Sequence, residues 1–344
     1  MSDHPYRDLP ARQFWKRAVS DRHIADLAEL WKPIRLTRSD RIATAGSCFA
    51  QHIGRQLSAR GAAFMDCEPA PDAFVSAHEA RRFGFGVYSC RYGNIYTSRQ
   101  LVQLFEECFG KRSPTDVVWE RNGRFFDALR PSVDPVGQDS AETVLRLRER
   151  HLAAVRRMFE TLDVFVFTLG LTETWLSRCD GTAFPSAPGA IAGSYDPEAH
   201  EFGNLRYPDI LADLTAFIDG LRAVNPRARV LFTVSPVPLV ATASDDHVLP
   251  ATIYSKSVLR AVAGDLAADY EHVGYFPSYE IVAGHPSRAM FFDPDLRNVN
   301  LFGVQSVMRQ FFVDDLAREF PERGQAAAEE DGELICDEKA LERG

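Results

Sequence analysis

The chain has 344 residues, of which 45% are hydrophobic and 25% are charged, which is the composition of an ordinary globular protein. Its formal net charge is −9 and it has no long basic block, which argues against nucleic-acid binding because phosphate contacts need a concentrated positive surface. No stretch approaches the roughly 20 apolar residues that span a bilayer, and the first residues lack the apolar core of a secretion signal. We therefore expect a soluble, cytoplasmic protein without a transmembrane segment.

The six cysteines are scattered along the chain and include no CxxC pair. The usual spacing of a structural zinc site is therefore absent. A disulfide framework is not expected in a chain of this length. We predict neither a metal site nor a cofactor.

From the N-terminus, the chain alternates between predicted helices and strands. Residues 1–38 are a polar lead-in with a helical stretch near residues 14–31. A strand at residues 40–45 precedes a helix at residues 48–60, whose apolar residues recur at four-residue spacing. Gly61 ends this helix at the position that favours glycine.

A stretch rich in glycine and aromatic residues, 83–96, predicts a loop rather than a strand of the core. Thr97 or Ser98 caps the helix that follows this loop. Asn122 and Gly123 predict the turn of a hairpin. The rest of the chain has predicted helices at 141–162, 207–224, 255–270 and 300–320 and predicted strands at 163–169, 229–234 and 274–276.

This alternation predicts one α/β domain over residues 39–321, with a central, mostly parallel sheet in a three-layer α/β/α arrangement. The strand at 163–169 is a continuous apolar run, as in a parallel sheet covered on both faces. Residues 171–206 show little regular pattern, and a loop of that length is usually an active-site cover or a disordered insert. The acidic tail, residues 322–344, has the composition of a disordered segment.

Polar residues follow three of the predicted strands, at Ser47, at residues 170–173 and at Ser235. Ligands of open α/β sheets bind beyond the carboxyl ends of the strands, so these residues mark a candidate site. The alternative is that small and polar residues simply end strands.

Ser47 lies at a corner between a strand and a helix. Backbone N–H groups and the helix dipole favour a developing negative charge there, which suits an acyl-enzyme nucleophile. The alternative is that Ser47 only caps the helix. Cys48 is the rival nucleophile, although free cysteines usually pack in the core.

Five short blocks resemble the GSCFA family, which is placed among the SGNH/GDSL-type hydrolases. They are residues 46–50 (GSCFA), 92–97 (YGNIYT), 168–175 (TLGLTETW), 235–238 (SPVP) and 255–260 (SKSVLR). The resemblance runs over most of the chain and implies an SGNH hydrolase-like fold with a serine-based site, but no particular substrate.

The same resemblance implies roles for individual residues. Ser47 corresponds to the catalytic serine, and Gly93 to the glycine whose N–H binds the oxyanion. Thr172 stands where the wider superfamily has an asparagine that completes the oxyanion hole. Asn94, next to Gly93, is the alternative source of that amide.

The chain departs from the superfamily at the Asp-x-x-His block, which reads DLRN at residues 295–298. Asparagine cannot act as a base, so either the protein is inactive or the base comes from elsewhere. His247 is the first candidate base, because it lies in the loop after the strand at 229–234. His285 is the alternative base.

Two further residues line the predicted site without an assigned role. Glu173 is an acid, a base or an orienting group, or it only complements the first turn of a helix. Lys256 assists the serine or neutralises Glu173. His52, one turn or more beyond Ser47, is expected to be structural.

Together these residues predict a serine-dependent esterase or acyltransferase for O-acyl groups, such as acetyl groups on a carbohydrate. Its expected partner is a small-molecule or carbohydrate acyl ester. The alternative is a catalytically degenerate protein of the same fold that binds a glycan or a partner in polysaccharide or envelope assembly. The oligomeric state does not follow from the sequence.

Overall fold

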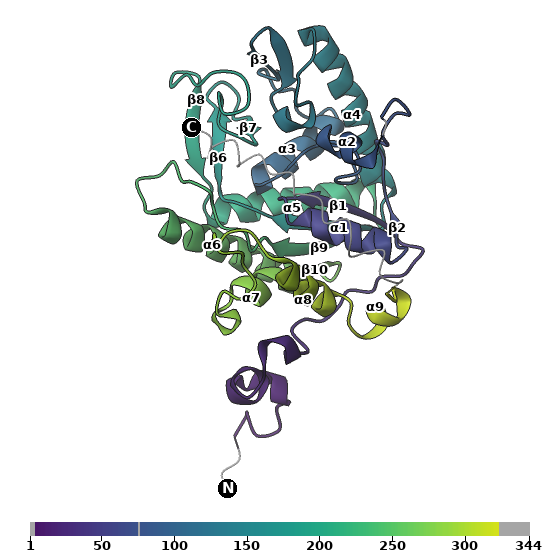
Figure 1. Cartoon of the computed structure of the whole chain (residues 1–344), viewed down its shortest axis with the longest axis vertical. Coiled ribbons are helices and arrows are strands. Elements are labelled where there is room, and N and C mark those ends of the chain that lie inside the picture. The colour runs from purple at the N-terminus through teal and green to yellow at the C-terminus, as the bar shows by residue number, and fades with distance from the viewer. Residues whose placement is uncertain (1–3, 75, 323–344) are drawn as a thin grey trace.

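A five-stranded parallel sheet runs through the centre of the computed structural model, which describes residues 4–74 and 76–322 (Figure 1). In spatial order its strands are β10 (Val273–Phe276), β9 (Arg229–Val234), β5 (Val164–Leu169), β1 (Arg41–Gly46) and β2 (Ala63–Phe64). Every neighbouring pair in this sheet is parallel.

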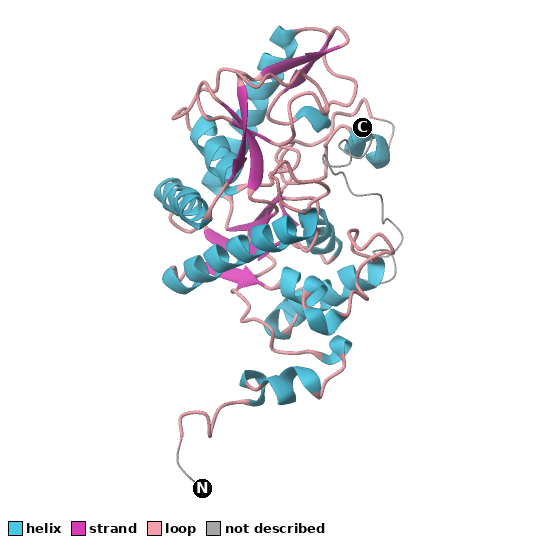
Figure 2. Cartoon of the chain, turned by 90° about the vertical axis from the view of Figure 1, so that its left-hand side faces the viewer, coloured by secondary structure: helices cyan, strands magenta, loops and turns pink. Residues whose placement is uncertain are grey.

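Helices cover both faces of this sheet, as Figure 2 shows. One face packs against α3 (Ser98–Cys108), α4 (Ala141–Thr161), α5 (Tyr207–Val224) and α6 (Val248–Asp269). The other packs against α1 (Ala50–Ala59), α7 (Ser278–Ala283), α8 (Leu301–Phe311) and α9 (Asp314–Glu319). In β5, Phe165 and Phe167 enter the first core, whereas Val164 and Val166 enter the second. The predicted three-layer α/β/α fold is confirmed.

The strand order determines where a ligand can bind. Numbered along the chain, the five strands lie in the order 2-1-3-4-5, so the chain reverses its direction across the sheet between β1 and β5. In open α/β sheets, ligands bind outside the carboxyl ends of the strands at such a reversal. Gly46, the last residue of β1, pairs with Thr168, and β5 ends one residue later at Leu169, so Ser47 and Gly170 both follow the carboxyl ends of these strands.

Two local predictions are confirmed by backbone geometry. Thr97 caps the N-terminus of α3, and its side chain and that of Gln100 form a capping box. The predicted hairpin consists of β3 (Val118–Arg121) and β4 (Arg124–Asp127). Its turn residues, Asn122 and Gly123, both have positive φ, at 54° and 73°.

Residues 171–206 contradict the prediction of little regular structure. They form a three-stranded antiparallel side sheet, with β6 (Glu173–Ser177) between β7 (Ala183–Phe184) and β8 (His200–Asn204) (Figure 1). Glu173 therefore begins a strand and does not complement a helix. The pattern is weak because β7 is only two residues long and because β6 pairs with a strand more than twenty positions later.

Three other expectations need correction. Residues 14–31 form no continuous helix, only short turns at Lys16–Ser20 and Ile24–Asp26, because the first of these buries no side chain that would stabilise a longer helix. The last predicted helix is two helices, since α8 ends at Phe311 before α9 begins at Asp314. Helix α6 begins earlier than predicted. Residues 323–344 lie outside the described residues, so disorder there stays a prediction.

Within the described residues, no helix is both long enough and apolar enough to cross a membrane.

Candidate active site

Ser47 lies directly beyond the carboxyl end of β1, and its backbone N–H donates to the carbonyl of Thr168 at 3.0 Å. The glycine before it is required by this geometry. Gly46 has a φ of 129°, and an added Cβ would lie 2.3 Å from the Thr168 oxygen. The GS pair therefore lets the chain turn away from β5 while it remains bonded to that strand.

The Ser47 hydroxyl is buried and makes no hydrogen bond to any described residue. Nor does a serine side chain cap α1, so the capping role considered for Ser47 is not what the structure contains. Buried polar groups are nearly always hydrogen-bonded, and an exception needs an explanation. A hydroxyl kept for a reacting group is such an explanation. Cys48, the rival nucleophile, is also buried.

Gly170 lies against Ser47 on the neighbouring strand. A Cβ added there would be 3.1 Å from the Ser47 Cβ and 3.1 Å from the Tyr96 carbonyl oxygen. The N–H groups of Gly170 and Leu171 both donate to that carbonyl, at 3.0 and 2.9 Å. The loop before α3 is therefore fastened to the end of β5 next to the serine.

The Tyr88 hydroxyl connects Asn94 to Ser47 by hydrogen bonds. Tyr88 was not among the residues predicted from the sequence. The Tyr88 hydroxyl lies 2.6 Å from Asn94 Oδ1 and 3.1 Å from the Ser47 carbonyl oxygen. The Ile95 N–H donates to the Gly46 carbonyl at 2.9 Å, which fixes the same loop to β1. Because the amide oxygen of Asn94 faces Tyr88, its NH₂ group points away from that hydroxyl.

Gly93 has a φ of 68°, and a Cβ added there would point toward residues of the 130–133 turn. Thr172 is buried, and its hydroxyl donates to Asn204 Oδ1 at 2.7 Å. An asparagine therefore does lie beside residues 168–175, but it is Asn204 of β8. Sequence reasoning missed Asn204 because it lies 32 residues from Thr172.

Helix α6 contributes two buried side chains to the same region. Lys256 Nζ donates to the Gly170 carbonyl at 2.6 Å, and Ser255 Oγ accepts from the Thr172 N–H at 3.0 Å. Lys256 is fully buried. The bond to the Gly170 carbonyl holds the Lys256 amine beside the residue that lies against Ser47.

The two histidines proposed as bases are both exposed, and each contacts another group. His247 is exposed and caps α6, with its Nδ1 accepting from the Leu249 N–H at 3.1 Å. It precedes Lys256 by nine residues, which is about 13 Å along a helix. His285 is exposed and stacks on Trp15, with 5.2 Å between the ring centroids. Neither is hydrogen-bonded to the Ser47 hydroxyl.

The block that replaces Asp-x-x-His forms a closed turn. The Asp295 carboxylate accepts hydrogen bonds from the backbone N–H groups of Arg297 and Asn298 and from the Asn298 side chain. Against the effect of burial, these hydrogen bonds lower the pKa of Asp295. The aspartate therefore stabilises its own turn and orients no base.

Glu173 lies half-buried at the start of β6. Its carboxylate accepts from the Thr242 hydroxyl at 2.7 Å and from the Ala243 N–H at 3.4 Å. Burial raises the pKa of this carboxyl. Glu173 thus ties the loop between β9 and α6 to the side sheet.

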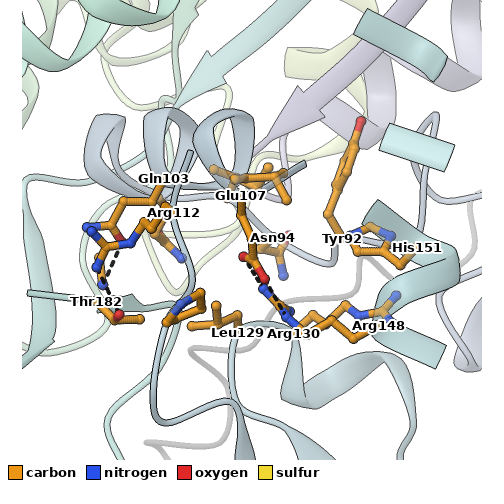
Figure 3. Close-up of a pocket in the computed structure, with 15 residues that line it drawn as sticks. Tyr92, Asn94, Gln103, Glu107, Arg112, Leu129, Arg130, Arg148, His151 and Thr182 are labelled. Atoms are coloured by element: carbon orange, nitrogen blue, oxygen red, sulfur yellow. Dashed lines mark hydrogen bonds and ion pairs between the residues drawn. The ribbon is translucent and has the colours of Figure 1, made fainter. Parts of the chain in front are cut away.

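A cluster of buried charges lies next to Asn94, around a cavity of about 30 Å³ (Figure 3). Arg148 bonds both Glu107 and Asp127, and Arg130 bonds Asp127 at 2.7 Å. These ions pair with one another, and a cavity of this size has room for about one water. The cluster is therefore a support for the loop that carries Asn94 rather than a substrate site.

Across residues 4–74 and 76–322, no three His, Cys, Asp or Glu side chains converge in a way that could hold a metal ion.

Comparison with known proteins places the chain in a family. Two solved structures are similar to it: a carbohydrate esterase family 3 protein from Talaromyces cellulolyticus and an acetyl xylan esterase from the rumen bacterium Butyrivibrio proteoclasticus. The first is 16% identical, with a TM-score of 0.25, over 62% of this chain and 86% of that chain. The second is 13% identical, with a TM-score of 0.24, over 72% of this chain and 57% of that chain.

No curated protein matches the chain. A family model described as the GSCFA family matches residues 41–311, which is most of the sequence. The match begins at the strand that leads to Ser47 and ends with α8, so it contains the central sheet and every side chain of the candidate site. The chain therefore belongs to the GSCFA family.

Proposed function

We propose that this protein is a serine-dependent esterase or acyltransferase that acts on O-acyl groups, with Ser47 as its nucleophile. The observation that carries the proposal is the Ser47 hydroxyl, which is buried, makes no hydrogen bond to a described residue and lies where the sheet reverses. A hydroxyl in this state is costly unless a ligand uses it.

In the proposed reaction, Ser47 Oγ attacks the carbonyl carbon of an acyl ester while a base takes the hydroxyl proton. The tetrahedral oxyanion receives hydrogen bonds from the NH₂ group of Asn94 and, as the family resemblance suggests, from the Gly93 N–H. The C–O bond to the alcohol then breaks, and the alcohol leaves with the proton. Water or a sugar hydroxyl takes the acyl group from Ser47, which distinguishes a hydrolase from a transferase.

Lys256 is our first choice for the base. Its amine, when neutral, has a lone pair to accept the Ser47 proton, and it is bonded to the carbonyl of the glycine that touches Ser47. His247, the base suggested by the sequence, serves only if the loop before α6 moves it toward the serine. A lysine base predicts a rate that rises with pH as the amine deprotonates.

The experiment is hydrolysis of short-chain aryl esters by the wild type and by Ser47→Ala, Lys256→Met and His247→Ala. Exposed Ser58→Ala and His78→Ala are the matched controls. We expect Ser47→Ala and Lys256→Met to lose at least a hundredfold in kcat, with the other three variants near wild type. Loss of activity in Ser47→Ala and His247→Ala, with Lys256→Met active, would assign the base to that histidine. Full activity in Ser47→Ala would overturn the proposal.

The second candidate function is ligand binding without turnover. The closed turn at Asp295, which offers no histidine, favours it. Titration calorimetry with acetylated xylo-oligosaccharides separates the two functions. A protein that only binds would give the same affinity for wild type and Ser47→Ala, and neither would release acetate.

A further inference from the structure

Two cysteines outside the proposed catalytic site lie on neighbouring segments of the chain. Cys67 follows β2, and Cys90 belongs to the loop that carries Asn94. The Cys67 N–H donates to the carbonyl of Ser89 at 2.8 Å, which brings the two segments side by side. Both side chains belong to the same apolar core, in which Cys90 is buried and Cys67 packs at the margin. Cys67 is partly exposed, whereas Cys90 is 2% exposed with its Sγ 3.8 Å from Met158 Sδ.

The surroundings of the two thiols differ, and they give the two thiols different pKa values and reactivity. The neighbouring Cys90 thiol and the positive charge of Arg157 lower the pKa of Cys67, against the effects of burial and of the Asp66 and Glu68 carboxylates. Arg157 is held there by a 2.9 Å hydrogen bond to the Cys67 carbonyl. Burial raises the pKa of Cys90. Since the thiolate is the nucleophilic form, Cys67 is the attacking group and Cys90 keeps its proton.

We propose that Cys67 and Cys90 form a reversible oxidation site for small hydroperoxides. The Cys67 thiolate attacks one peroxide oxygen, the O–O bond breaks and hydroxide or alkoxide leaves, which gives a sulfenic acid on Cys67. The Cys90 sulfur then attacks Cys67 Sγ and the S–O bond breaks. The leaving hydroxide takes the Cys90 proton and departs as water. The two thiols lose two electrons to the peroxide, and a dithiol reductant restores them.

The disulfide would act on the loop that borders Ser47. That loop is already bonded to β1, where Ser89 Oγ accepts from the Thr44 N–H at 3.0 Å and the Ile95 N–H donates to Gly46. A covalent bond from Cys90 to Cys67 would also join it to the segment after β2. The inference does not depend on esterase activity, so the two proposals can fail separately.

The test treats the full chain with a small excess of hydrogen peroxide, alkylates the remaining thiols after denaturation and maps the peptides. We expect a cross-linked peptide that joins Cys67 to Cys90 and disappears with dithiothreitol. Cys67→Ser should abolish it, and Cys90→Ser should stop at a sulfenic acid that dimedone captures. Cys108→Ser, which removes another buried thiol, should leave the cross-link intact. Recovery of Cys67 and Cys90 as alkylated thiols would overturn the proposal, as would oxidation of Cys67 without the cross-link.

A second measurement tests the assignment of Cys67 as the attacking thiol. Arg157→Gln should slow peroxide consumption at Cys67 several-fold, because less of the thiol is ionised. The adjacent Arg156→Gln is the matched control, since Arg156 pairs with Glu160 instead. Equal rates in the two variants would show that Arg157 does not activate Cys67, and would overturn that assignment.

Discussion

At the scale of single residues, the position of Ser47 requires that Gly46 and Gly170 carry no side chain. Gly46 and Gly170 approach Thr168 and Ser47 at distances that a Cβ would not allow without movement. We expect Gly170→Ala to lower kcat about tenfold and to destabilise the fold by about 1–3 kcal/mol, because the new methyl group pushes Ser47 or Tyr96 aside.

Ester hydrolysis and urea denaturation measure the two effects of Gly170→Ala. Gly264→Ala is the control, because only the flexible Arg260 side chain comes close to that position and alanine favours the helix. Unchanged kinetics in Gly170→Ala would contradict the assigned position of the nucleophile.

Tyr88 is a positioning residue for Asn94, since its hydroxyl holds the amide oxygen and touches the Ser47 carbonyl. Tyr88→Phe keeps the ring in the core but releases that amide. We expect kcat to fall about tenfold to a hundredfold with little change in KM, because the oxyanion donor loses its orientation. Steady-state kinetics beside the exposed control Tyr195→Phe checks this. A rise in KM at constant kcat would instead indicate a role in substrate binding.

At the scale of elements, Glu173 connects the side sheet to the loop between β9 and α6 through Thr242 and Ala243. Glu173→Gln leaves a neutral acceptor, which forms weaker hydrogen bonds than a carboxylate. We expect faster amide hydrogen exchange across residues 240–247 and no change in the central sheet. Glu201→Gln, on β8, is the control because its partner Arg178 lies within the side sheet. Equal exchange in both variants would mean that Glu173 does not restrain the loop.

At the scale of the whole molecule, the buried ionic cluster links stability to pH. Burial alone would raise the pKa of Asp127, but Arg148 and Arg130 outweigh burial and lower it to about 2. An acid with a lowered pKa in the folded state stabilises the fold above its ordinary pKa, and this stability is lost as pH falls toward the folded value. We therefore expect the free energy of unfolding to decrease between about pH 4 and pH 2.

Denaturation of Asp127→Asn at pH 7 and at pH 3 tests this linkage. The variant should lose about 3–5 kcal/mol at pH 7, because two arginines lose a buried counter-ion, and it should depend less on pH than the wild type. Exposed Asp72→Asn should retain the full pH dependence. A wild-type stability that is flat from pH 4 to pH 2 would show that Asp127 is not held ionised.

How far the sequence predicts this protein depends on the distance between interacting residues. Continuous apolar runs predicted β5 and β9, and the corner before Ser47 predicted the end of β1, because these signals are local. The side sheet was not predicted because β6 pairs with β8 across a long turn-rich stretch. Tyr88 and Asn204 were not predicted for the same reason. Only the fold brings the Tyr88 hydroxyl to the Ser47 carbonyl and the Asn204 amide to the Thr172 hydroxyl.

The chain enters and leaves the side sheet at two residues that are hydrogen-bonded to each other. The Leu205 N–H donates to the Thr172 carbonyl at 2.8 Å, directly before α5 begins. The segment between Thr172 and Leu205, which contains the side sheet, therefore starts and ends at the same place on the path from β5 to α5. Insertions and deletions within such a segment leave the spacing of the main elements unchanged. A residue inserted in a turn of the side sheet should therefore leave Gly170 and the adjacent Ser47 in place.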